Sequence, residues 1–404
     1  MEWKEVRLGD VCEIKHGFAY KGKYFSDTPT CDILVTPGNF TLSGGFKLDK
    51  PKFYNGPVEK DYILSKGDLI VTMTDLSKNI DTLGYSALVP EVKGLTFHHN
   101  QRIGLVENIA NNVDKYFLYW IMRTPAYQSF IATHSSGTTV HHTSPKGIGN
   151  YVFKLPPLDD QRRIASILSS LDRKIELNNK INADLEEMAQ AIFKNWFVDF
   201  EPFKDGKFVD SELGMIPEGW KVVVFDNILK VTTTKTGKEG IPEYSVTNTG
   251  IHPRDEKFTK NLSKSSAKNK LIRKGNLVFG MSREILNWGI MKEEVGGVSS
   301  AYNVYIVDEK IVSTTYLECF IAQRMDYFAD LIKPASREGQ GVDKALLMKK
   351  IICIPPSEVL DVFLEKYNSI MHLTEIRNQE NSRLSTLRDT LLPRLMSGEL
   401  EVPE

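Results

Sequence analysis

The sequence of 404 residues is poor in cysteine and has no long apolar run. None of the four cysteines belongs to a Cys-x-x-Cys pair, and they lie far apart, at Cys12, Cys31, Cys319 and Cys353. This spacing argues against a disulfide framework and against structural zinc, and it fits a reducing cytoplasm. A run of about 18 apolar residues, which a transmembrane helix needs, is missing. The first residues also lack the pattern of an export signal. We therefore expect a cytoplasmic chain.

The sequence motifs of common catalytic sites are missing as well. Neither a Gly-x-Gly-x-x-Gly loop nor a P-loop is present, so nothing predicts a cradle for nucleotide phosphates. The motifs His-Glu-x-x-His and Gly-x-Ser-x-Gly are also absent. Two proline pairs, Pro156-Pro157 and Pro355-Pro356, lack the flanking Asn or Asp and the aromatic residue of an amino-methyltransferase site. We expect a binding protein that has no catalytic or metal site.

Composition and charge indicate a globular chain with a repeated organisation. Hydrophobic residues make up 41% of the sequence, enough for packed cores, and the length predicts two to four domains. Lys and Arg number 51, against 52 Asp and Glu. Residues 1–157 and 201–356 are slightly basic, whereas residues 158–200 and 357–404 are acidic. Two long and two short segments thus alternate.

Short motifs recur in the same order in both halves, which predicts an internal duplication. Each Lys-Gly pair among them predicts a turn before a buried strand, and each proline pair precedes a long helical stretch. The matching runs are residues 2–6 with 219–223, 66–75 with 274–283, 102–106 with 303–307, and 156–157 with 355–356.

Two long helices with a heptad seam are predicted after the proline pairs. Steps of four and three residues separate the seam positions, which is the spacing of a coiled coil. The first seam is Ile164, Leu168, Leu171, Ile175, Asn178, Asn182, Leu185, Ala189 and Ile192. The positions 199 residues later are Phe363, Tyr367, Ile370, Thr374, Arg377, Asn381, Leu384, Arg388 and Leu391.

Asn182 and Asn381 occupy equivalent places in the two seams. A polar seam residue costs stability but can fix the register of the pair. We expect the helices to pack on each other and to form a spacer of about 45 Å for 30 residues. The alternative is two surface helices that pack separately on their own domains.

Basic and polar segments favour contact with nucleic acid. Residues 254–283 contain nine Lys or Arg and two acidic residues, a composition suited to neutralising phosphates. The loops 135–146 and 336–344 combine glycine with side chains that can reach base edges or phosphates. The alternatives are a solvated charged face for the basic run and ordinary surface loops for the other two segments.

The chain as a whole resembles the specificity (S) subunit of a type I restriction-modification system. The most specific motif is Phe193-Lys-Asn-Trp-Phe-Val-Asp-Phe-Glu-Pro-Phe203, followed by Gly214-Met-Ile-Pro-Glu-Gly-Trp220. Pro156-Pro-Leu-Asp-Asp-Gln-Arg-Arg-Ile164 resembles the entry to the family's first spacer helix. Leu391-Leu-Pro-Arg-Leu-Met-Ser-Gly-Glu-Leu400 resembles the end of the second. The second half departs from the pattern because residues 355–360 lack the Gln-Arg pair.

The resemblance implies an α/β (α+β) fold with a two-fold internal repeat. Two globular target-recognition domains would be separated by two long helices that pair as an antiparallel coiled coil. The expected limits are 1–157 for the first recognition domain, 158–200 for the central spacer helix, 201–356 for a linker and the second recognition domain, and 357–404 for the C-terminal spacer helix and tail.

The resemblance also implies a non-catalytic DNA-specificity subunit. Each recognition domain would read one half of a bipartite, asymmetric site on double-stranded DNA, and the paired helices would set the gap. Two modification subunits would dock on the helices and bring S-adenosylmethionine and adenine-N6 methylation. Restriction subunits that use ATP and Mg would join them, and this chain would carry no cofactor and no metal.

Individual residues are proposed for DNA binding and for docking. The candidate DNA contacts are Thr138, Thr139, His141 and Lys146 in the first half, and Lys270, Lys274, Arg283, Arg337, Gln340 and Lys344 in the second. Asp75 and Arg283 occupy equivalent positions with opposite charge, as expected of domains that read different sequences. Four aromatic residues are candidates either for partner docking or for core packing: Trp196, Phe197, Phe200 and Phe203.

Two other functions remain open from the sequence. One is a partner-independent DNA-binding protein derived from this family. The other is a two-headed coiled-coil scaffold that joins proteins without nucleic acid.

Overall fold

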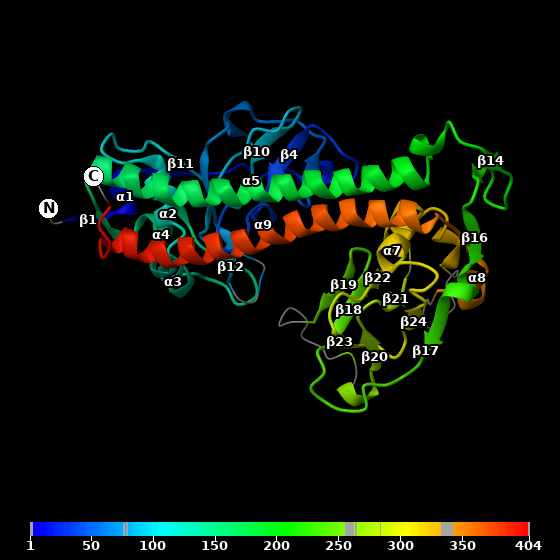
Figure 1. Ribbon diagram of the computed structural model, residues 1–404. Helices are drawn as coiled ribbons and strands as arrows, with labels where there is room; N and C mark the ends of the chain where they lie inside the picture. Colours follow the sequence, from blue (N-terminus) through cyan, green and yellow to red (C-terminus); the bar gives the residue numbers. More distant parts are fainter. Residues whose placement is uncertain are drawn as a thin grey trace. The chain divides into compact units, whose positions relative to one another are not determined.

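A computed structural model of the chain describes residues 3–75, 77, 80–254, 262, 265–282, 284–332 and 342–402. The chain divides into two compact units: unit 1 contains residues 1–179 and 378–404, and unit 2 contains residues 180–377. Two long helices, α5 (Leu158–Phe197) and α9 (Ser357–Ser397), each contribute one part to each unit (Figure 1). Both helices begin directly after a proline pair. The domain limits expected from the sequence, which separate the helices from the recognition domains, stay a prediction.

Unit 1 combines short strands with small helices around the first part of α5 and the last part of α9. Its strands are β1 (Lys4–Arg7), β2 (Glu13–His16), β3 (Phe25–Ser26), β4 (Asp32–Val35), β5 (Lys52–Tyr54), β6 (Ile63–Leu64), β7 (Leu69–Thr72), β8 (Thr74–Asp75), β9 (Ser86–Leu88), β10 (Thr96–His99), β11 (Ile103–Glu107), β12 (His141–His142) and β13 (Val152–Leu155). Its small helices are α1 (Leu8–Val11), α2 (Lys115–Ile121), α3 (Pro125–Thr133) and α4 (Pro145–Gly149).

Unit 2 has the same kind of organisation. Its strands are β14 (Phe208–Val209), β15 (Ile216–Pro217), β16 (Lys221–Val224), β17 (Leu229–Thr232), β18 (Tyr244–Thr247), β19 (Gly250–Pro253), β20 (Lys270–Arg273), β21 (Leu277–Phe279), β22 (Trp288–Ile290), β23 (Val295–Val298), β24 (Asn303–Val307) and β25 (Ile351–Ile354). Its small helices are α6 (Phe225–Ile228), α7 (Thr314–Gln323) and α8 (Lys344–Lys349).

The strand order confirms the internal duplication. Unit 1 contains a four-stranded antiparallel sheet in the order β2-β11-β7-β9, and unit 2 contains one in the order β17-β24-β21-β22. The opening strand of each unit pairs with its closing strand, β1 with β13 and β16 with β25. Each closing strand leads into a long helix. The same chain path is therefore used twice.

The predicted Lys-Gly turns precede buried strands in both units. Gly67 has φ of 78° and Gly275 has φ of 80°, in the left-handed region where glycine has no steric cost. The amide of Gly67 donates to the carbonyl of Val89 (2.8 Å), and that of Gly275 donates to the carbonyl of Met291 (2.9 Å). The turns lead directly into β7 and β21, which are fully buried.

Strand pairing corrects one detail of the sequence match. The sequence aligns residues 102–106 with 303–307, but the pairing places Gly104 opposite Val71 and Asn303 opposite Phe279. Since Val71 and Phe279 are equivalent in the two Lys-Gly runs, Gly104 corresponds to Asn303 and the match shifts by two residues. Side chains alternate between the faces of a strand with a period of two, so a two-residue shift leaves the hydrophobic pattern intact. That pattern could not reveal the error.

Each unit has its own main hydrophobic core, to which both long helices contribute. In unit 1, Trp120 and Tyr127 pack with Leu168 of α5 and Leu395 of α9. In unit 2, the core contains Phe193 and Phe197 of α5 together with Phe363 of α9. Burying a large apolar side chain contributes roughly 1.5–3 kcal/mol. The helices are therefore structural parts of both units.

The long helices pair antiparallel within each unit, as expected. In unit 1, Asp172 on α5 contacts Arg388 on α9, and farther along α5 Asn178 contacts Asn381. In unit 2, the ring of Phe197 at the end of α5 lies 4.8 Å from that of Phe363 near the start of α9. Residue numbers rise on one helix as they fall on the other.

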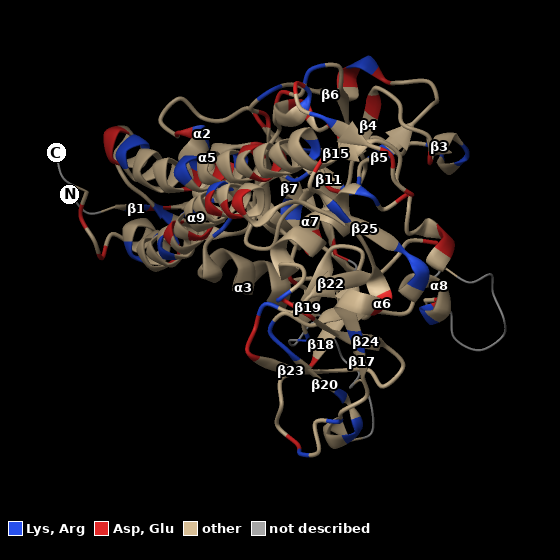
Figure 2. Cartoon of the chain, turned by 45° about the vertical axis from the view of Figure 1, so that its right-hand side comes forward, with Lys and Arg blue, Asp and Glu red and all other residues tan. Residues whose placement is uncertain are grey.

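Basic and acidic residues alternate along both α5 and α9 (Figure 2). The first turn of α5 includes Asp159 and Asp160, which lie three residues before Arg162 and Arg163. Among the described residues, no helix is long and apolar enough to cross a membrane.

Candidate nucleic-acid interface

A polar loop between α3 and α4 protrudes from unit 1. Strand β12 pairs antiparallel with β8, and Ser136 and His142 exchange backbone hydrogen bonds of 3.0 and 2.8 Å. The backbone between them is thereby closed into a loop, on which Thr138 and Thr139 are exposed. His141 is half-buried, with a buried Nδ1 atom that has no hydrogen-bond partner. The first three candidates thus lie on one small loop.

Asp75 does not face solvent. Its side chain is 1% exposed, and its carboxylate accepts hydrogen bonds from the amides of Ser77 (2.6 Å), Thr82 (2.6 Å) and Leu83 (3.0 Å). Burial alone would raise the pKa of Asp75, but the hydrogen bonds from Ser77 and Thr82 hold it below its ordinary value. The carboxylate of Asp75 is therefore bonded to the backbone of Ser77, Thr82 and Leu83 rather than exposed on the surface.

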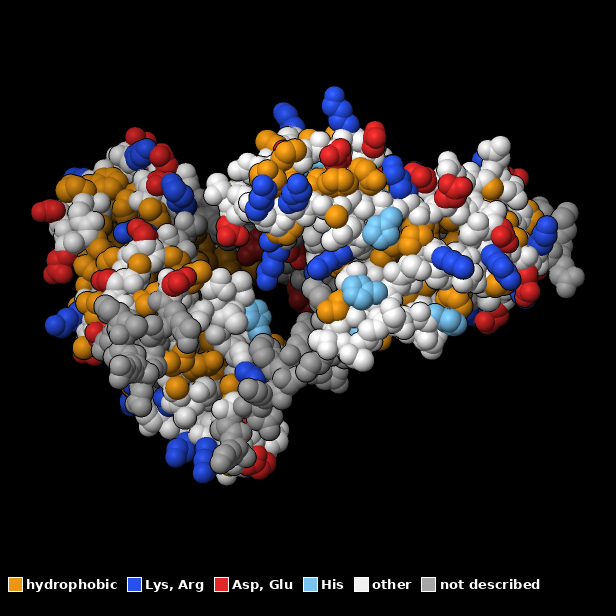
Figure 3. Space-filling view, turned by 180° about the vertical axis from the view of Figure 1, so that it is seen from behind, with side chains coloured by type: hydrophobic (Ala, Val, Ile, Leu, Met, Phe, Trp, Pro, Cys, Tyr) orange, Lys and Arg blue, Asp and Glu red, His pale blue; other side chains and the backbone are white. Residues whose placement is uncertain are grey.

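Lys146 lies on the short helix α4, which begins after Ser144. The Ser144 hydroxyl accepts a hydrogen bond from the amide of Gly147 (3.1 Å) and so caps this helix. Lys146 itself is exposed. The space-filling view shows histidine, lysine and arginine side chains on one face of unit 1, among hydrophobic and acidic side chains (Figure 3). Such a surface can accept phosphates.

Two of the candidate lysines in unit 2 already have partners. The Nζ atom of Lys270 donates to the carbonyl of Tyr302 (2.5 Å), and burial lowers the pKa of Lys270, helped by the charge of Lys344. Lys274 forms an exposed ion pair with Glu294 (3.3 Å). Lys344 is exposed at the start of α8. Lys270 thus holds the β23–β24 turn, whereas Lys344 is accessible.

Three candidates, Arg283, Arg337 and Gln340, lie outside the described residues. So do residues 255–261, 263 and 264 of the basic run. Their proposed contacts with DNA stay predictions.

Every predicted seam position of both helices is buried or half-buried. In unit 1, the amide nitrogen of Asn178 donates to the carboxylate of Glu380 (2.8 Å) and to the side-chain oxygen of Asn381 (2.9 Å). The side-chain nitrogen of Asn381 donates in turn to Asn179 (2.8 Å). Asn178, rather than Asn182, is therefore the hydrogen-bonding partner of Asn381. These hydrogen bonds can form in only one register of the two helices. The polar layer would therefore specify how the helices align.

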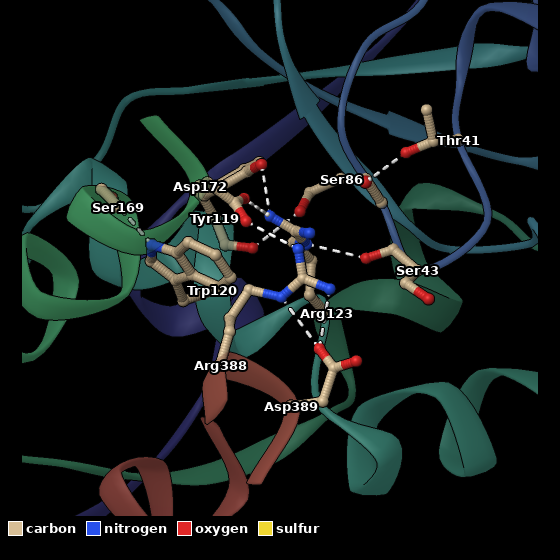
Figure 4. Close-up of polar contacts among 11 residues, drawn as sticks. Thr41, Ser43, Ser86, Tyr119, Trp120, Arg123, Ser169, Asp172, Arg388 and Asp389 are labelled. Carbon is tan, nitrogen blue, oxygen red and sulfur yellow. Dashed lines mark hydrogen bonds and ion pairs between the residues drawn. The ribbon is translucent and has the colours of Figure 1, made fainter. Parts of the chain in front are cut away.

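A buried ionic network joins the globular part of unit 1 to both helices (Figure 4). Arg123, which follows α2, donates to Asp172 of α5 (2.8 Å), to the Tyr119 hydroxyl (2.5 Å) and to the carbonyl of Ser43 (2.7 Å). The other carboxylate oxygen of Asp172 accepts from Arg388 of α9 (2.6 Å). One carboxylate on α5 thus bridges two guanidinium groups, one from the turn after α2 and one from α9.

Packing reinforces this network. The guanidinium carbon of Arg123 lies 4.3 Å from the ring centroid of Trp120, within cation–π range. Burial alone would lower the pKa of Arg388, but the bonds to Asp172 and Asp389 raise it. Neither Arg123 nor Asp172 stands out in the sequence, because 49 residues separate them and neither belongs to a motif. The one available signal was Arg388, a charge at a seam position that requires an acidic partner.

The four aromatic residues considered for docking lie in or against the core of unit 2. Phe197 is buried, while Trp196, Phe200 and Phe203 are half-buried and pack against that core. The rings of Phe200 and Phe203 lie 5.1 and 5.4 Å from that of Trp220. Core packing, one of the two roles that the sequence left open, is what these contacts provide. Docking of a partner on their outer edges stays a prediction.

Nothing in the described part of the chain is arranged as a metal centre. No group of three or more His, Cys, Asp or Glu side chains there could hold a metal ion. Burial raises the pKa of Cys12 and of Cys353 to about 12, which disfavours the reactive thiolate.

Several known proteins are similar to this chain in sequence. Residues 1–187 match the family model described as Type I restriction modification DNA specificity domain. The type I restriction enzyme MjaIX specificity subunit of Methanocaldococcus jannaschii is 28% identical over 308 residues, which cover 71% of this chain and 69% of that protein. The HindI specificity subunit of Haemophilus influenzae is 25% identical over 482 residues, covering 99% of this chain and 100% of that protein.

The fold is also found in a solved structure. The S subunit of a type I restriction-modification system from M. genitalium aligns with a TM-score of 0.55 and 12% identity, covering 98% of this chain and 96% of that one. Sequence similarity along almost the whole chain, the repeated topology and the antiparallel helix pair lead to the same assignment. Residues 1–187 match the DNA specificity domain of type I restriction enzymes, and the chain is similar along its length to specificity subunits of those enzymes.

Proposed function

We propose that this chain is the DNA sequence-specificity subunit of a type I restriction-modification complex. Each unit reads one half of a bipartite, asymmetric site on double-stranded DNA. The chain acts in the cytoplasm and performs no catalysis itself. Its task is to decide where the other subunits modify or cut.

One observation carries this proposal. Two units whose four-stranded sheets have the same strand order present different exposed side chains while sharing one pair of antiparallel helices. Two related but non-identical readers are what an asymmetric site in two halves requires. A shared helix pair connects the readers and, because a helix rises about 1.5 Å per residue, its length sets the unread gap.

Partner subunits supply the chemistry in this proposal. Two modification subunits dock on the helix pair and bring S-adenosylmethionine for adenine-N6 methylation. Restriction subunits with ATP and Mg join the assembled core. The mixture of basic and acidic residues along α5 and α9 is suited to such docking through rim ion pairs. This chain needs no cofactor of its own.

Methylation mapping tests the proposal. The chain is expressed with its cognate modification subunit in a host that lacks other adenine-N6 methylation, and genomic N6-methyladenine is mapped by sequencing. We expect a motif of two short halves separated by a fixed gap. Replacement of residues 1–157 by those of a relative should change one half and leave the other unchanged.

The competing functions predict different results. A partner-independent DNA-binding protein would bind the bipartite site equally well without the modification subunit. A protein scaffold would leave no motif, even with an active modification subunit bound to it. Either result would overturn the proposal.

A further inference from the structure

The turn that connects β10 to β11 in unit 1 is held by four hydrogen bonds, three between backbone groups and one to the Asn100 side chain. The amide of Ile103 donates to the carbonyl of Asn100 (2.9 Å), and the Asn100 side chain accepts from the amide of Arg102 (3.1 Å). The amide of Gln101 donates to the carbonyl of Phe18 (2.9 Å), and the carbonyl of Arg102 accepts from the amide of Met73 (2.9 Å). The backbone of this turn is thereby fixed from both sides.

A neighbouring glycine allows this close contact. A Cβ atom on Gly17 would lie 2.1 Å from the carbonyl oxygen of Asn100, so a side chain at position 17 would displace the turn. Asn100 is 7% exposed. The turn is therefore packed at its base.

The two residues at the tip have the opposite character. Gln101 and Arg102 are exposed, and within the described part of the chain their side chains have no hydrogen-bond or ion-pair partner. Gln can bond both the N6 and N7 atoms of adenine, and Arg both the O6 and N7 atoms of guanine. Holding the backbone rigid reduces the conformational entropy lost when such side chains bind. The tip therefore presents two base-reading side chains on a fixed support.

Unit 2 has the same turn with a different tip. The amide of Tyr302 donates to the carbonyl of Ser299 (3.0 Å), and the Ser299 hydroxyl accepts from the amide of Ala301 (3.3 Å). These bonds correspond one for one to those of Asn100 with Ile103 and Arg102. The exposed tip residues are Ser300 and Ala301 in place of Gln101 and Arg102. The scaffold is kept and the tip is changed, as expected of positions that read different sequences.

The first tip also lies beside the polar loop of unit 1. The backbone of Met73 donates to Arg102 and accepts from the amide of Thr143 (3.0 Å), so it connects the turn to the strand that closes that loop. His142, next to Thr143, is exposed. Two segments that are distant in the sequence thus form one surface.

We propose that Gln101 and Arg102 are specificity-determining residues that bond to base edges in the half-site read by unit 1. This inference rests on the proposed function and names the residues through which one half of it operates. Ser300 and Ala301 occupy the equivalent place in unit 2 and read other base pairs or none. The rigid turn places the side chains, and their chemical identity selects the bases.

The test uses the full chain assembled with its modification subunit, with variants Arg102→Ala and Gln101→Ala. Genome-wide methylation mapping should show that one base position of one half is relaxed in each variant. The preference at that position should fall by about tenfold to a hundredfold, the discrimination expected of one bidentate pair. The other half and the gap should stay unchanged. Lys93→Ala is the matched control, since Lys93 is an exposed residue on the turn before β10 and should leave the motif intact.

A transplant provides a second, independent measurement. The double variant Ser300→Gln/Ala301→Arg places the first tip on the second turn, and we expect it to alter the other half of the motif. An unchanged motif in Arg102→Ala and Gln101→Ala would overturn the inference and leave the proposed function standing. An equal loss of methylation at all sites would also overturn it, because it would identify phosphate contacts. A wild-type complex with no bipartite motif would instead overturn the proposed function itself.

Discussion

At the scale of single residues, the most consequential groups are polar and buried. Asp172 accepts hydrogen bonds from Arg123 and Arg388, and all three side chains are largely removed from solvent. Two guanidinium charges are acceptable there because Asp172 lies between them, Asp389 also pairs with Arg388, and neutral oxygens accept from Arg123. Removing one member of such a group leaves an uncompensated buried charge. The resulting loss of unfolding free energy exceeds the stability that the ion pair itself contributes.

Asp172→Ala should therefore lower the free energy of unfolding of unit 1 by about 3 kcal/mol or more. The measurement is urea unfolding, followed by circular dichroism, of the purified chain. Asp159→Ala is the control, because Asp159 pairs with Arg162 at 3.6 Å on the exposed surface of the same helix. That variant should lose under about 0.5 kcal/mol. Equal losses in the two variants would contradict the buried network.

A second prediction concerns the support of the β10–β11 turn. Gly17→Ala should destabilise unit 1 by about 1–3 kcal/mol, because the added Cβ overlaps the Asn100 backbone. Gly22→Ala is the control, since its Cβ would meet nothing closer than 3.9 Å. We expect that substitution to be neutral or slightly stabilising. Thermal unfolding of both variants measures the difference, and a Gly17→Ala protein as stable as wild type would contradict the close packing.

His99 should make unit 1 sensitive to acid. Burial lowers the pKa of His99 from 6.5 to about 4, although its ring Nε2 bonds to the carbonyl of Ile103 (2.7 Å). The unfolded chain therefore takes up this proton at a higher pH than the folded one. The stability linked to His99 is fully present above about pH 6.5 and is lost as the pH falls toward 4.

Unfolding free energies measured between pH 7 and 4 test this dependence. His99→Asn should lose less stability on acidification than wild type, whatever its stability at pH 7. His134→Asn, a substitution of an exposed histidine, serves as the control and should keep the wild-type slope. Identical slopes in all three proteins would show that His99 does not govern the effect.

At the scale of secondary-structure elements, the long helices were the most predictable part. The seam repeats every three or four residues, so local spacing alone identifies the buried stripe. The same spacing does not show which polar residues meet. The contact of Asn381 with Asn178 depends on the antiparallel register and became visible in the structure.

The Asn layer should couple the two helices energetically. In a double-mutant cycle with Asn178→Ala, Asn381→Ala and the double variant, we expect an interaction energy of about 0.5–3 kcal/mol. Chemical denaturation of the four proteins supplies the values. A cycle with Ser170 in place of Asn178 is the control, because Ser170 is exposed on the same helix and bonds to the carbonyl of Ile167. Additivity in the Asn cycle would mean that the layer does not couple the helices.

At the scale of the whole molecule, neither recognition segment is complete without the helices. The core of unit 2 includes Phe193, Phe197 and Phe363, which are at most 5% exposed. At roughly 1.5–3 kcal/mol each, losing them would remove about as much as the 5–15 kcal/mol that stabilises a typical domain.

A fragment of residues 180–377 should therefore fold, whereas a fragment of residues 201–356 should not. We expect a cooperative thermal transition and dispersed NMR signals from the longer fragment. The shorter one should lack both. Cooperative folding of residues 201–356 alone would show that the recognition segment is independent of the helices and that the predicted domain limits describe folding units.

The sequence by itself determined the duplication, the two long helices and the resemblance to specificity subunits, because motif order and heptad spacing are properties of nearby residues. It also located the polar loop that carries Thr138 and Thr139. The tertiary structure decided that Asp75 turns inward, that Asp172 joins Arg123 to Arg388, and that the second-half match shifts by two residues. It also brought the Gln101–Arg102 tip beside β12. These features arise from contacts between distant segments, and residue spacing along the chain does not encode which distant segments meet.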